Sequence, residues 1–228
     1  ALPISGRVGD ARPALELLTC EDPLEALRLA EELEQSNEQR KAIARDALAD
    51  ARTLLGAGDT AADDARAMIA DGLVAVRGPW LPGVLGLVAG RLADEYGRPA
   101  LVAHEGETDD GVGMLRASIR APRGYSVAAA LQEHGAHFLR HGGHAGAGGC
   151  SLPAAGWRDA TASLGATFAA QQSARVPLLD VDLELHAGGR NPELLAGLVG
   201  FLEPTGVGNP EPLFLLRGVL LQIGRAHV

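Results

Sequence analysis

Two short apolar runs, Leu73–Val76 and Ala100–Ala103, flank a segment with helical periodicity, and this pattern most restricts how the chain can fold. The segment begins at Pro82, a residue favoured in the first turn of a helix, and its apolar residues recur on one face as far as Tyr96. Each run has the length and composition of a buried strand. A strand, a helix and a strand with short links form a βαβ unit, whose strands are parallel with a right-handed crossover. The sequence therefore predicts an α/β fold.

Further patterns extend the same domain. Apolar runs over residues 111–122 and 147–152 predict two more strands. Helical periodicity predicts helices over residues 126–139, with Ser126 as the N-cap, and over residues 157–171. We therefore expect a mixed sheet with flanking helices.

A long helix is expected before this domain. Asp22 is a favourable N-cap, Pro23 suits the first helical position, and Gly56 follows the last apolar residue. The middle of the helix, residues 35–40, has no apolar side chain for more than one turn. Because a helix that is polar all round in its centre commonly bridges two domains, we interpret residues 22–56 as an inter-domain connector.

The pattern changes after Pro177. Residues 179–186 alternate apolar and polar side chains, as a half-buried strand does, and residues 213–221 form a further apolar strand, with a helix expected between them over residues 192–202. Because two strands cannot close a barrel, this β-rich domain is expected to be cut short. The final residues, 223–228 ("IGRAHV"), match the translation of a widely used sequencing adapter and are expected to be an artefact.

The composition limits the classes of function. A formal net charge of −9 argues against a protein that coats nucleic acid without specificity. Two cysteines are too few for a disulfide framework, which favours a reducing cytoplasm, and no apolar stretch is long enough to span a membrane. Residues 114–144 are locally basic, with four arginines against one acid, Glu133. Such a segment suits an anion site, although a basic solvated surface has the same composition. The arginines are Arg116, Arg120, Arg123 and Arg140.

Four of the seven histidines lie close together: His134, His137, His141 and His144. The first three follow helical spacing, so we expect them on one helix face, with Gly142 and Gly143 ending the helix. A metal site is one interpretation, because histidines one turn apart on a helix bind zinc. Against it, positions seven apart are separated by roughly 10 Å along a helix. A structural role for His134 and His137 is the simpler interpretation.

The glycine-rich stretch of residues 141–149 offers a different chemistry. Glycines let a ligand approach the backbone amides, and a neighbouring histidine can donate to a phosphate oxygen. Ser118 and Arg120, two apart on a predicted strand, project from the same face and can hold a phosphate through several donors. A serine and an arginine on an exposed edge strand are the alternative interpretation. The two segments form one site only if the fold brings them together.

Five segments, in order, resemble the motifs of RecJ-type single-strand-specific exonucleases of the DHH phosphoesterase superfamily. "SGRVGDARPALELL" resembles their Asn-Ala-Ala-Gly-Arg segment, and "PWLPGVLGLVAGRLADEYGRPALV" resembles the start of their DHH-associated domain. "ASIRAP" stands where they carry Gly-Ser-x-Arg-Ser, and "GGHAGAGG" where they carry Gly-Gly-His-Ala-x-Ala-Ala-Gly. "GVGNPEPLF" resembles the entry to their oligonucleotide-binding fold. The resemblance runs from Gly6 to about Leu221.

The resemblance implies a metal-dependent phosphodiesterase that removes nucleotides from the 5′ end of single-stranded DNA, in repair and recombination in the cytoplasm. Its Mn²⁺ or Mg²⁺ would be held by an N-terminal DHH domain, of which only residues 1–21 are expected here. This chain would then be the substrate-holding half, inactive alone and without catalytic or metal-binding residues. Residues 57–175 would be the DHH-associated domain, and residues 176–222 part of an oligonucleotide-binding domain. A single-strand-binding protein and a helicase are further implied partners. The implied phosphate-binding residues are Arg7, Ser118, Arg120, Gly142, Gly143 and His144.

Two other functions stay open. A nanoRNA or cyclic-dinucleotide phosphodiesterase of the same superfamily shares the Gly-Gly-His motif, but the connector helix and the oligonucleotide-binding entry favour the exonuclease. The other is a non-catalytic nucleic-acid-binding module that lacks a metal domain. Trp80 also has two interpretations, a base-stacking platform or a packed cover over the core.

Overall fold

The computed structural model of this protein describes residues 11–56, 66–70, 72–107, 113–173, 181–186, 197, 199–206 and 208–218. They belong to two compact units, Ala1–Arg175 and Val176–Val228. Arg7, residues 223–228 and most of the helix expected over residues 192–202 lie outside the described residues.

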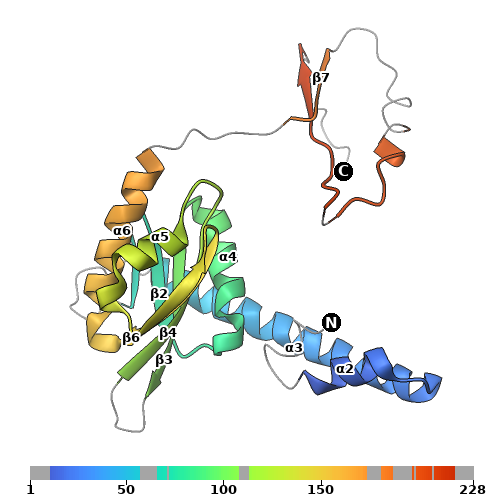
Figure 1. The fold of residues 1–228 in the computed structure, drawn as a ribbon, viewed down its shortest axis with the longest axis horizontal. Coiled ribbons are helices and arrows are strands. Elements are labelled where there is room, and N and C mark those ends of the chain that lie inside the picture. The colour runs from blue at the N-terminus through green and yellow to red at the C-terminus, as the bar shows by residue number, and fades with distance from the viewer. Residues whose placement is uncertain are drawn as a thin grey trace, which may run out of the picture. The chain divides into compact units, whose positions relative to one another are not determined.

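Six strands form the sheet of the first unit, in the order β1-β2-β3-β4-β6-β5 (Figure 1). β2 and β3 pair in parallel, and every other neighbouring pair is antiparallel. The mixed sheet and the parallel βαβ unit predicted from the sequence are confirmed. The strands are β1 (Ala67–Ile69), β2 (Val74–Gly78), β3 (Ala100–Glu107), β4 (Gly113–Arg120), β5 (Arg140–His144) and β6 (Ala147–Pro153).

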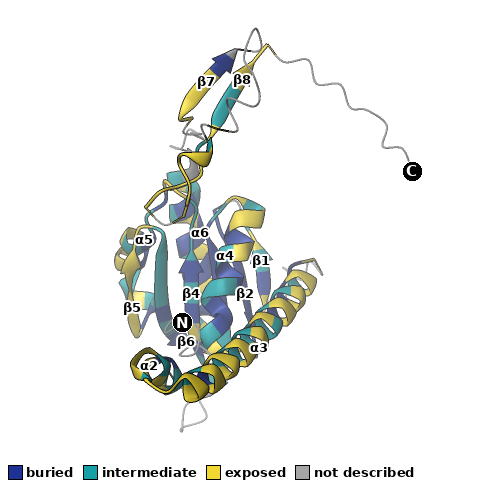
Figure 2. Ribbon diagram, turned by 90° about the vertical axis from the view of Figure 1, so that its right-hand side faces the viewer, coloured by how far each residue is buried: buried dark blue, intermediate teal, exposed yellow. Residues whose placement is uncertain are grey.

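Helices cover both faces of this sheet (Figure 2). α4 (Leu85–Tyr96) and the end of α3 (Pro23–Gly56) pack over β2 and β3 on one face. α5 (Val127–Glu133) and α6 (Trp157–Ser173) cover the other face, where Phe168 is fully buried. Strands covered on both faces must be apolar on both, which explains the continuous apolar runs of the βαβ unit.

On the α4 side the sheet is only partly covered. α4 lies against β2, β3 and β4, whereas β5 forms the edge of the sheet and all five of its residues are exposed. The polar face of the β4, β6 and β5 strands is therefore accessible, while their apolar face packs under α5 and α6. This difference between the two faces decides which side chains a ligand can reach.

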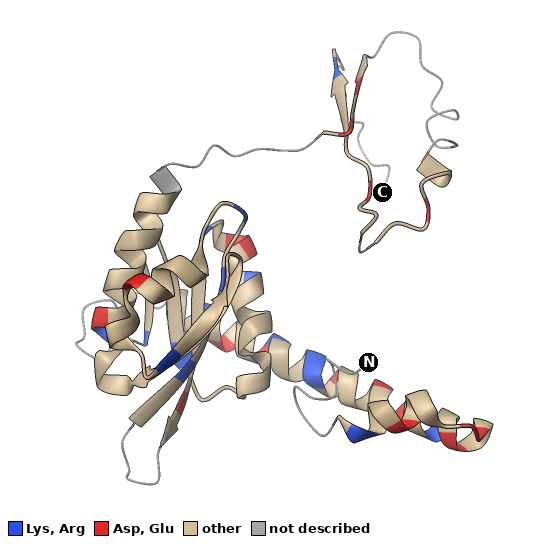
Figure 3. Cartoon of the chain, in the orientation of Figure 1, with Lys and Arg blue, Asp and Glu red and all other residues tan. Residues whose placement is uncertain are grey.

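α3 is the long helix predicted from the sequence. Asp22 caps it, because its Oδ1 accepts the N–H of Leu24 at 3.1 Å. Ala51 and Leu55, near the helix end, are buried in the core of the first unit. The opposite end packs against α2 (Arg12–Thr19), and both acidic and basic residues lie along the two helices there, the acidic ones in excess (Figure 3). Within the described residues, neither α3 nor any other helix is long and apolar enough to cross a membrane.

The helix predicted over residues 126–139 is only half present. Ser126 is its N-cap, as predicted, and the serine hydroxyl accepts the N–H of Ala129 at 3.4 Å. The helix ends at Glu133, however, and a single 3₁₀ turn, η2 (Gly135–His137), follows it. The prediction that His134, His137 and His141 share one helix face is therefore wrong, because His141 lies in β5.

The glycine pair also differs from the prediction. Gly142 and Gly143 do not end a helix; they lie within β5, which pairs antiparallel with β6 and joins it through the short connection Ala145–Gly146. Two adjacent glycines weaken a helix. The backbone hydrogen bonds of the β5–β6 ladder then favour the strand, a long-range effect that helical periodicity cannot reveal.

The second unit contains a two-stranded parallel sheet, β7 (Leu183–His186) with β8 (Phe214–Arg217). Both strands fall within the apolar segments predicted over residues 179–186 and 213–221. Among the described residues of the second unit, Leu185 has a buried side chain, with 2% of its surface exposed. The parallel pairing was not predicted; parallel strands need a long connection, and these two are joined by the residues between His186 and Phe214.

Candidate anion-binding site

Four of the predicted site residues meet on the accessible face of the sheet: Ser118, Arg120, Gly142 and His144. Gly143 pairs with Gly148 and belongs to the opposite face, towards α5. Ser118 of β4 pairs with Gly149 of β6, which in turn pairs with Gly142 of β5. Directly paired residues of antiparallel strands point to the same face, so these three positions form one row across the sheet. The structure thus brings together two segments that the sequence could only treat separately.

A second row lies beside the first. Arg120 of β4 pairs with Ala147 of β6, and Ala147 pairs with His144 of β5. His144 is exposed at the end of its strand, next to the connection to β6. Two strand spacings separate the backbones of Arg120 and His144, roughly 10 Å. A ligand of the size of a phosphate group, resting on the glycine row, can be reached from both sides.

Arg120 is held in place by its surroundings. Its Nη1 donates to the hydroxyl oxygen of Ser118 at 3.2 Å and to the carbonyl oxygen of Ile119 at 2.9 Å. On the other side its guanidinium lies against α4 at Gly86, where an added Cβ would come within 2.7 Å of Nη2. A Cβ added to Gly90, one turn later in α4, would lie 4.0 Å from the Arg120 Cγ. The arginine is therefore positioned before any ligand arrives.

Gly86 of α4 is a position beside Arg120 and Ser118 that sequence reasoning missed. Gly86 and Gly90 were counted only as part of a helix, although their spacing of four residues places them on one face. Gly86 would also place a Cβ 3.2 Å from the Ser118 hydroxyl. A glycine pair one turn apart in a helix that covers a sheet is the signal that could have revealed this close approach.

The glycines of β5 and β6 have two different roles. A Cβ on Gly143 would lie 2.3 Å from the carbonyl oxygen of Ala147, and one on Gly148 would lie 2.7 Å from Val127. Gly143 is required by the close approach of the β6 backbone, and Gly148 by the packing of the hairpin on α5. Gly142, by contrast, has nothing within 4 Å of an added Cβ. The fold does not require a glycine there, and the missing side chain leaves the sheet surface open to a ligand.

His134 and His137 have structural partners. Nε2 of His134 lies 2.8 Å from the Thr167 hydroxyl, and Nε2 of His137 lies 3.2 Å from the Ser163 hydroxyl, both on α6. These contacts tie the turn after α5 to α6, away from the accessible face. Over the described ranges, no group of three or more His, Cys, Asp or Glu side chains is arranged to hold a metal ion.

Trp80 and Cys150 are core residues. Trp80 is 6% exposed and packs in the cluster beneath α4. Of its two interpretations, the structure therefore favours a packed cover over the core rather than a base-stacking platform. Cys150 points to the opposite face of the sheet from the site, and burial raises the pKa of its thiol to about 12. Neither side chain reaches a ligand on the accessible face.

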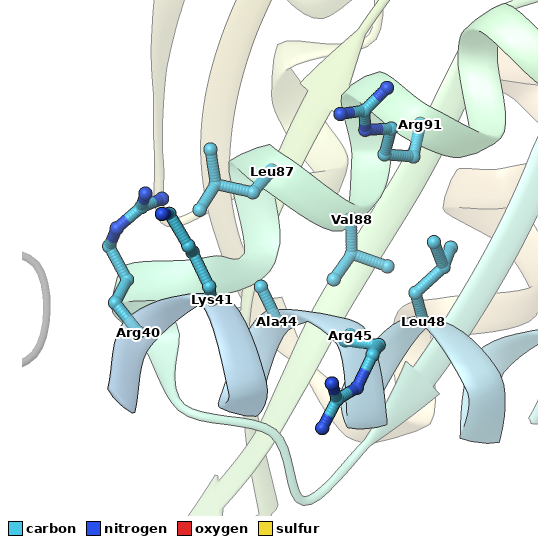
Figure 4. A pocket seen from close by; sticks show the side chains of 8 residues that line it. All are labelled: Arg40, Lys41, Ala44, Arg45, Leu48, Leu87, Val88 and Arg91. Carbon is cyan, nitrogen blue, oxygen red and sulfur yellow. The ribbon is translucent and has the colours of Figure 1, made fainter. Parts of the chain in front are cut away.

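A separate basic hollow of about 500 Å³ lies between α3 and α4 (Figure 4). Four cationic side chains border it above an apolar floor that includes Leu87 and Val88. Lys41 and Arg45 have acidic partners on their own helix, Glu38 and Asp46. Sequence reasoning treated these residues only as a polar connector. The cations are Arg40, Lys41, Arg45 and Arg91.

The charged side chains of the strands that form the accessible face are all positive. β4, β5 and β6 contain three arginines and no acidic residue (Figure 3). Because the chain as a whole is acidic, this surface is a local basic patch. Hydroxyl, guanidinium and imidazole donors around bare backbone form a surface suited to a phosphate group.

This chain is similar to several known proteins. Residues 70–170 match the model of the DHHA1 domain. The single-stranded-DNA-specific exonuclease RecJ of Bacillus subtilis is 29% identical over 95% of this chain, and RecJ of Thermus thermophilus is 33% identical over 94%. The chain spans only 26% and 29% of those two relatives.

Solved structures show the same similarity. The crystal structure of Thermus thermophilus RecJ in complex with Mg²⁺ superposes with a TM-score of 0.71 at 30% identity, covering 94% of this chain and 32% of that one. The complex of the same protein with Mn²⁺ gives a TM-score of 0.69. Residues 70–170 are therefore similar to a DHHA1 domain, and the chain is similar to about a quarter to a third of the length of RecJ single-stranded-DNA-specific exonucleases.

Proposed function

We propose that this chain is the substrate-holding part of a metal-dependent exonuclease that degrades single-stranded DNA from its 5′ end. The observation that carries the proposal is the meeting of Ser118, Arg120 and His144 around the bare Gly142–Gly149 row on an accessible sheet face. The RecJ relatives, whose names state a single-stranded-DNA-specific exonuclease, support the choice of substrate.

In this proposal the row binds the terminal or scissile phosphate. Arg120 supplies the charge, and it is partly buried between α4 and the sheet, so its attraction for an anion is screened less than at an open surface. Ser118 adds a hydroxyl donor, and His144 donates from the far side of the row. Gly142 lets the phosphate approach the backbone of β5. A phosphate-binding role for Gly143 stays a prediction. Arg7, in the same role, stays a prediction.

Cleavage is proposed to take place on metal ions held outside this chain. The described residues do not fit the Mg²⁺ or Mn²⁺ that the related structures contain, because no cluster of carboxylates and histidines lies among them. The chain's residues bind and orient the strand, and a DHH domain ending near residue 21 supplies the metals. Alone, this chain is then inactive.

The remaining assignments rest on the same relationship. Residues 22–56 connect the DHH domain to the DHH-associated domain of residues 57–175, and residues 176–222 belong to an oligonucleotide-binding domain. The enzyme acts in repair and recombination in the cytoplasm, with a single-strand-binding protein and a helicase as partners. The two-stranded β7–β8 sheet lies within the residues assigned to that oligonucleotide-binding domain.

Binding to matched oligonucleotides tests the proposal. Anisotropy titrations measure the affinities of this chain for a 5′-phosphorylated single strand and for the same strand with a 5′ hydroxyl. The affinity for a dinucleotide is measured in the same way. We expect the phosphorylated strand to bind about tenfold more tightly, and Arg120→Ala to remove that difference. Arg158→Ala removes an exposed charge from α6 on the other side of the sheet, and it should leave that difference in affinity unchanged. Equal binding of both strands by the unaltered chain would overturn the phosphate assignment, and tighter binding of the dinucleotide would favour a short-substrate phosphodiesterase.

A nuclease assay tests where the chemistry lies. Incubation of this chain with Mn²⁺ and a labelled single strand should give no cleavage products. Cleavage that survives further purification of the chain would contradict the placement of the metal centre outside it.

A further inference from the structure

A hollow of about 440 Å³ lies on the same sheet face, beyond the Ser118 row. Its polar lining consists of Arg116, Arg140, Ser151 and His104. The three residues Arg116, Ser151 and Arg140 are paired across β4, β6 and β5, and His104 of β3 pairs with Arg116 on the other side. Four segments of the chain therefore contribute to one row.

This row is the next one along the strands. Arg116 precedes Ser118 by two residues on β4, and Arg140 precedes Gly142 by two residues on β5. Two residues of an extended strand advance roughly 7 Å. That distance is close to the separation of neighbouring phosphates in an extended single strand. One strand of nucleic acid can therefore contact both rows with consecutive phosphates.

The charges of the row lack compensation within the described residues. Arg116 and Arg140 are both exposed, and neither forms an ion pair with a described side chain. No acidic residue is among the described side chains that line the hollow. The two guanidinium groups arise from strands roughly 10 Å apart, so they repel each other weakly and both attract an anion placed between them.

His104, which lines the hollow, carries a buried polar atom. Nδ1 of His104 is buried and has no hydrogen-bond partner among the described residues. An orphaned buried nitrogen costs free energy unless a ligand or water satisfies it. The hollow further has an apolar wall, formed by Pro82 and the largely exposed Leu139. Cations, a hydroxyl donor and an apolar wall together match one nucleotide unit.

We propose that this hollow is a second nucleotide subsite, which binds the phosphodiester between the first and second nucleotides of the bound single strand. Arg116 and Arg140 hold the phosphodiester from two sides, Ser151 donates between them, and Pro82 and Leu139 cover the adjacent sugar or base. The inference rests on the proposed function, because it takes the terminal 5′ phosphate, and not the scissile one, to lie on the Ser118 row. It makes affinity depend on at least two consecutive phosphates.

The test removes one charge at a time from protein and ligand. The probes are two 5′-phosphorylated oligothymidylates, one natural and one with a neutral methylphosphonate at the linkage between nucleotides one and two. The unaltered chain should bind the methylphosphonate strand about tenfold more weakly. The double variant Arg116→Gln/Arg140→Gln should bind the natural strand about tenfold more weakly and no longer distinguish the two probes.

Control variants separate the possible failures. Arg158→Gln removes a charge elsewhere and should leave both affinities and their ratio unchanged. Arg120→Ala should remove the dependence on the 5′ phosphate and keep the methylphosphonate effect. Equal binding of the two probes by the unaltered chain overturns the subsite, whatever the 5′-phosphate result. Loss of the 5′-phosphate dependence in the unaltered chain overturns the proposed function instead.

Both arginines are exposed, so their replacement should leave the fold intact, and thermal unfolding checks this. If the double variant unfolds early, the single variants Arg116→Gln and Arg140→Gln replace it. Each should then reduce the methylphosphonate effect, and a full effect in both would overturn the subsite.

Discussion

The Arg120 guanidinium donates to the Ser118 hydroxyl at 3.2 Å while its other end lies against Gly86 of α4. Two residues of one strand thus form a single donor group, and a helix glycine leaves the space for it. The arrangement makes α4 part of the binding surface as well as part of the core.

Gly86→Ala should weaken phosphate binding without loss of stability. The added methyl would lie 2.7 Å from Nη2 of Arg120, so the flexible end of that side chain must move. Alanine favours a helix over glycine by about 1 kcal/mol, which offsets any strain. We expect about a tenfold loss of affinity for a 5′-phosphorylated strand. The matched control is Gly90→Ala, whose added methyl makes only ordinary contact with Arg120; equal affinities of the two variants would contradict the prediction.

The two adjacent glycines of β5 should respond oppositely to alanine. Gly143→Ala places a Cβ 2.3 Å from the carbonyl oxygen of Ala147 and should destabilise the chain by about 1–3 kcal/mol. Gly142→Ala meets nothing within 4 Å and should unfold at the same temperature as the original chain, yet bind phosphate more weakly. Thermal unfolding and anisotropy titration measure the two effects. A folded Gly142→Ala variant with full affinity would show that the bare row is not a contact surface.

The histidines should separate into binding and structural residues. His144→Ala should weaken binding of 5′-phosphorylated strands and leave stability unchanged, because the side chain is exposed. His134→Ala removes the contact with Thr167 and should lower stability by about 1 kcal/mol while affinity stays the same. Urea unfolding and binding titrations of both variants check this division. Unchanged binding in both His144→Ala and Arg120→Ala would count against the site.

The two cysteines should differ in reactivity and in their effect on stability at high pH. Burial raises the pKa of Cys150 from 9.0 to about 12, so at pH 8 its thiol stays protonated and enclosed in the folded chain. Mass spectrometry should show that iodoacetamide modifies Cys20 first and Cys150 only after unfolding. Because the folded state holds this proton more tightly than the unfolded state, the stabilisation is complete below pH 9 and is lost as the pH rises towards 12. Cys150→Ser should flatten that decline; rapid alkylation of Cys150 in the folded chain would contradict its burial.

Local patterns were sufficient to predict much of the fold. The apolar runs around residues 73–76 and 100–103 predicted parallel strands, and Asp22 and Ser126 were identified as helix caps. These features depend on neighbouring residues, so sequence periodicity and capping chemistry reveal them. The spacing of Ser118 and Arg120 likewise fixed their common face.

Long-range pairing could not be predicted in the same way. The spacing of His134, His137 and His141 has helical period, but the pairing of β5 with β6 places the last of them in a strand. The same register joins Arg116 to Arg140, which are separated by a helix and several turns in the sequence. No local pattern specifies which strand lies at the sheet edge, so the shape of the site emerged only from the structure.

The position of β5 at the sheet edge has a consequence for dynamics. It pairs with β6 alone, and all five of its residues are exposed, so little buried surface opposes its separation. Short, exposed edge elements open locally at a small fraction of the global unfolding free energy. Amide protons of residues 140–144 should therefore exchange faster than those of β3, and a bound phosphate should slow them by mass action. Substrate release can then occur by fraying of a single strand while the βαβ core stays folded.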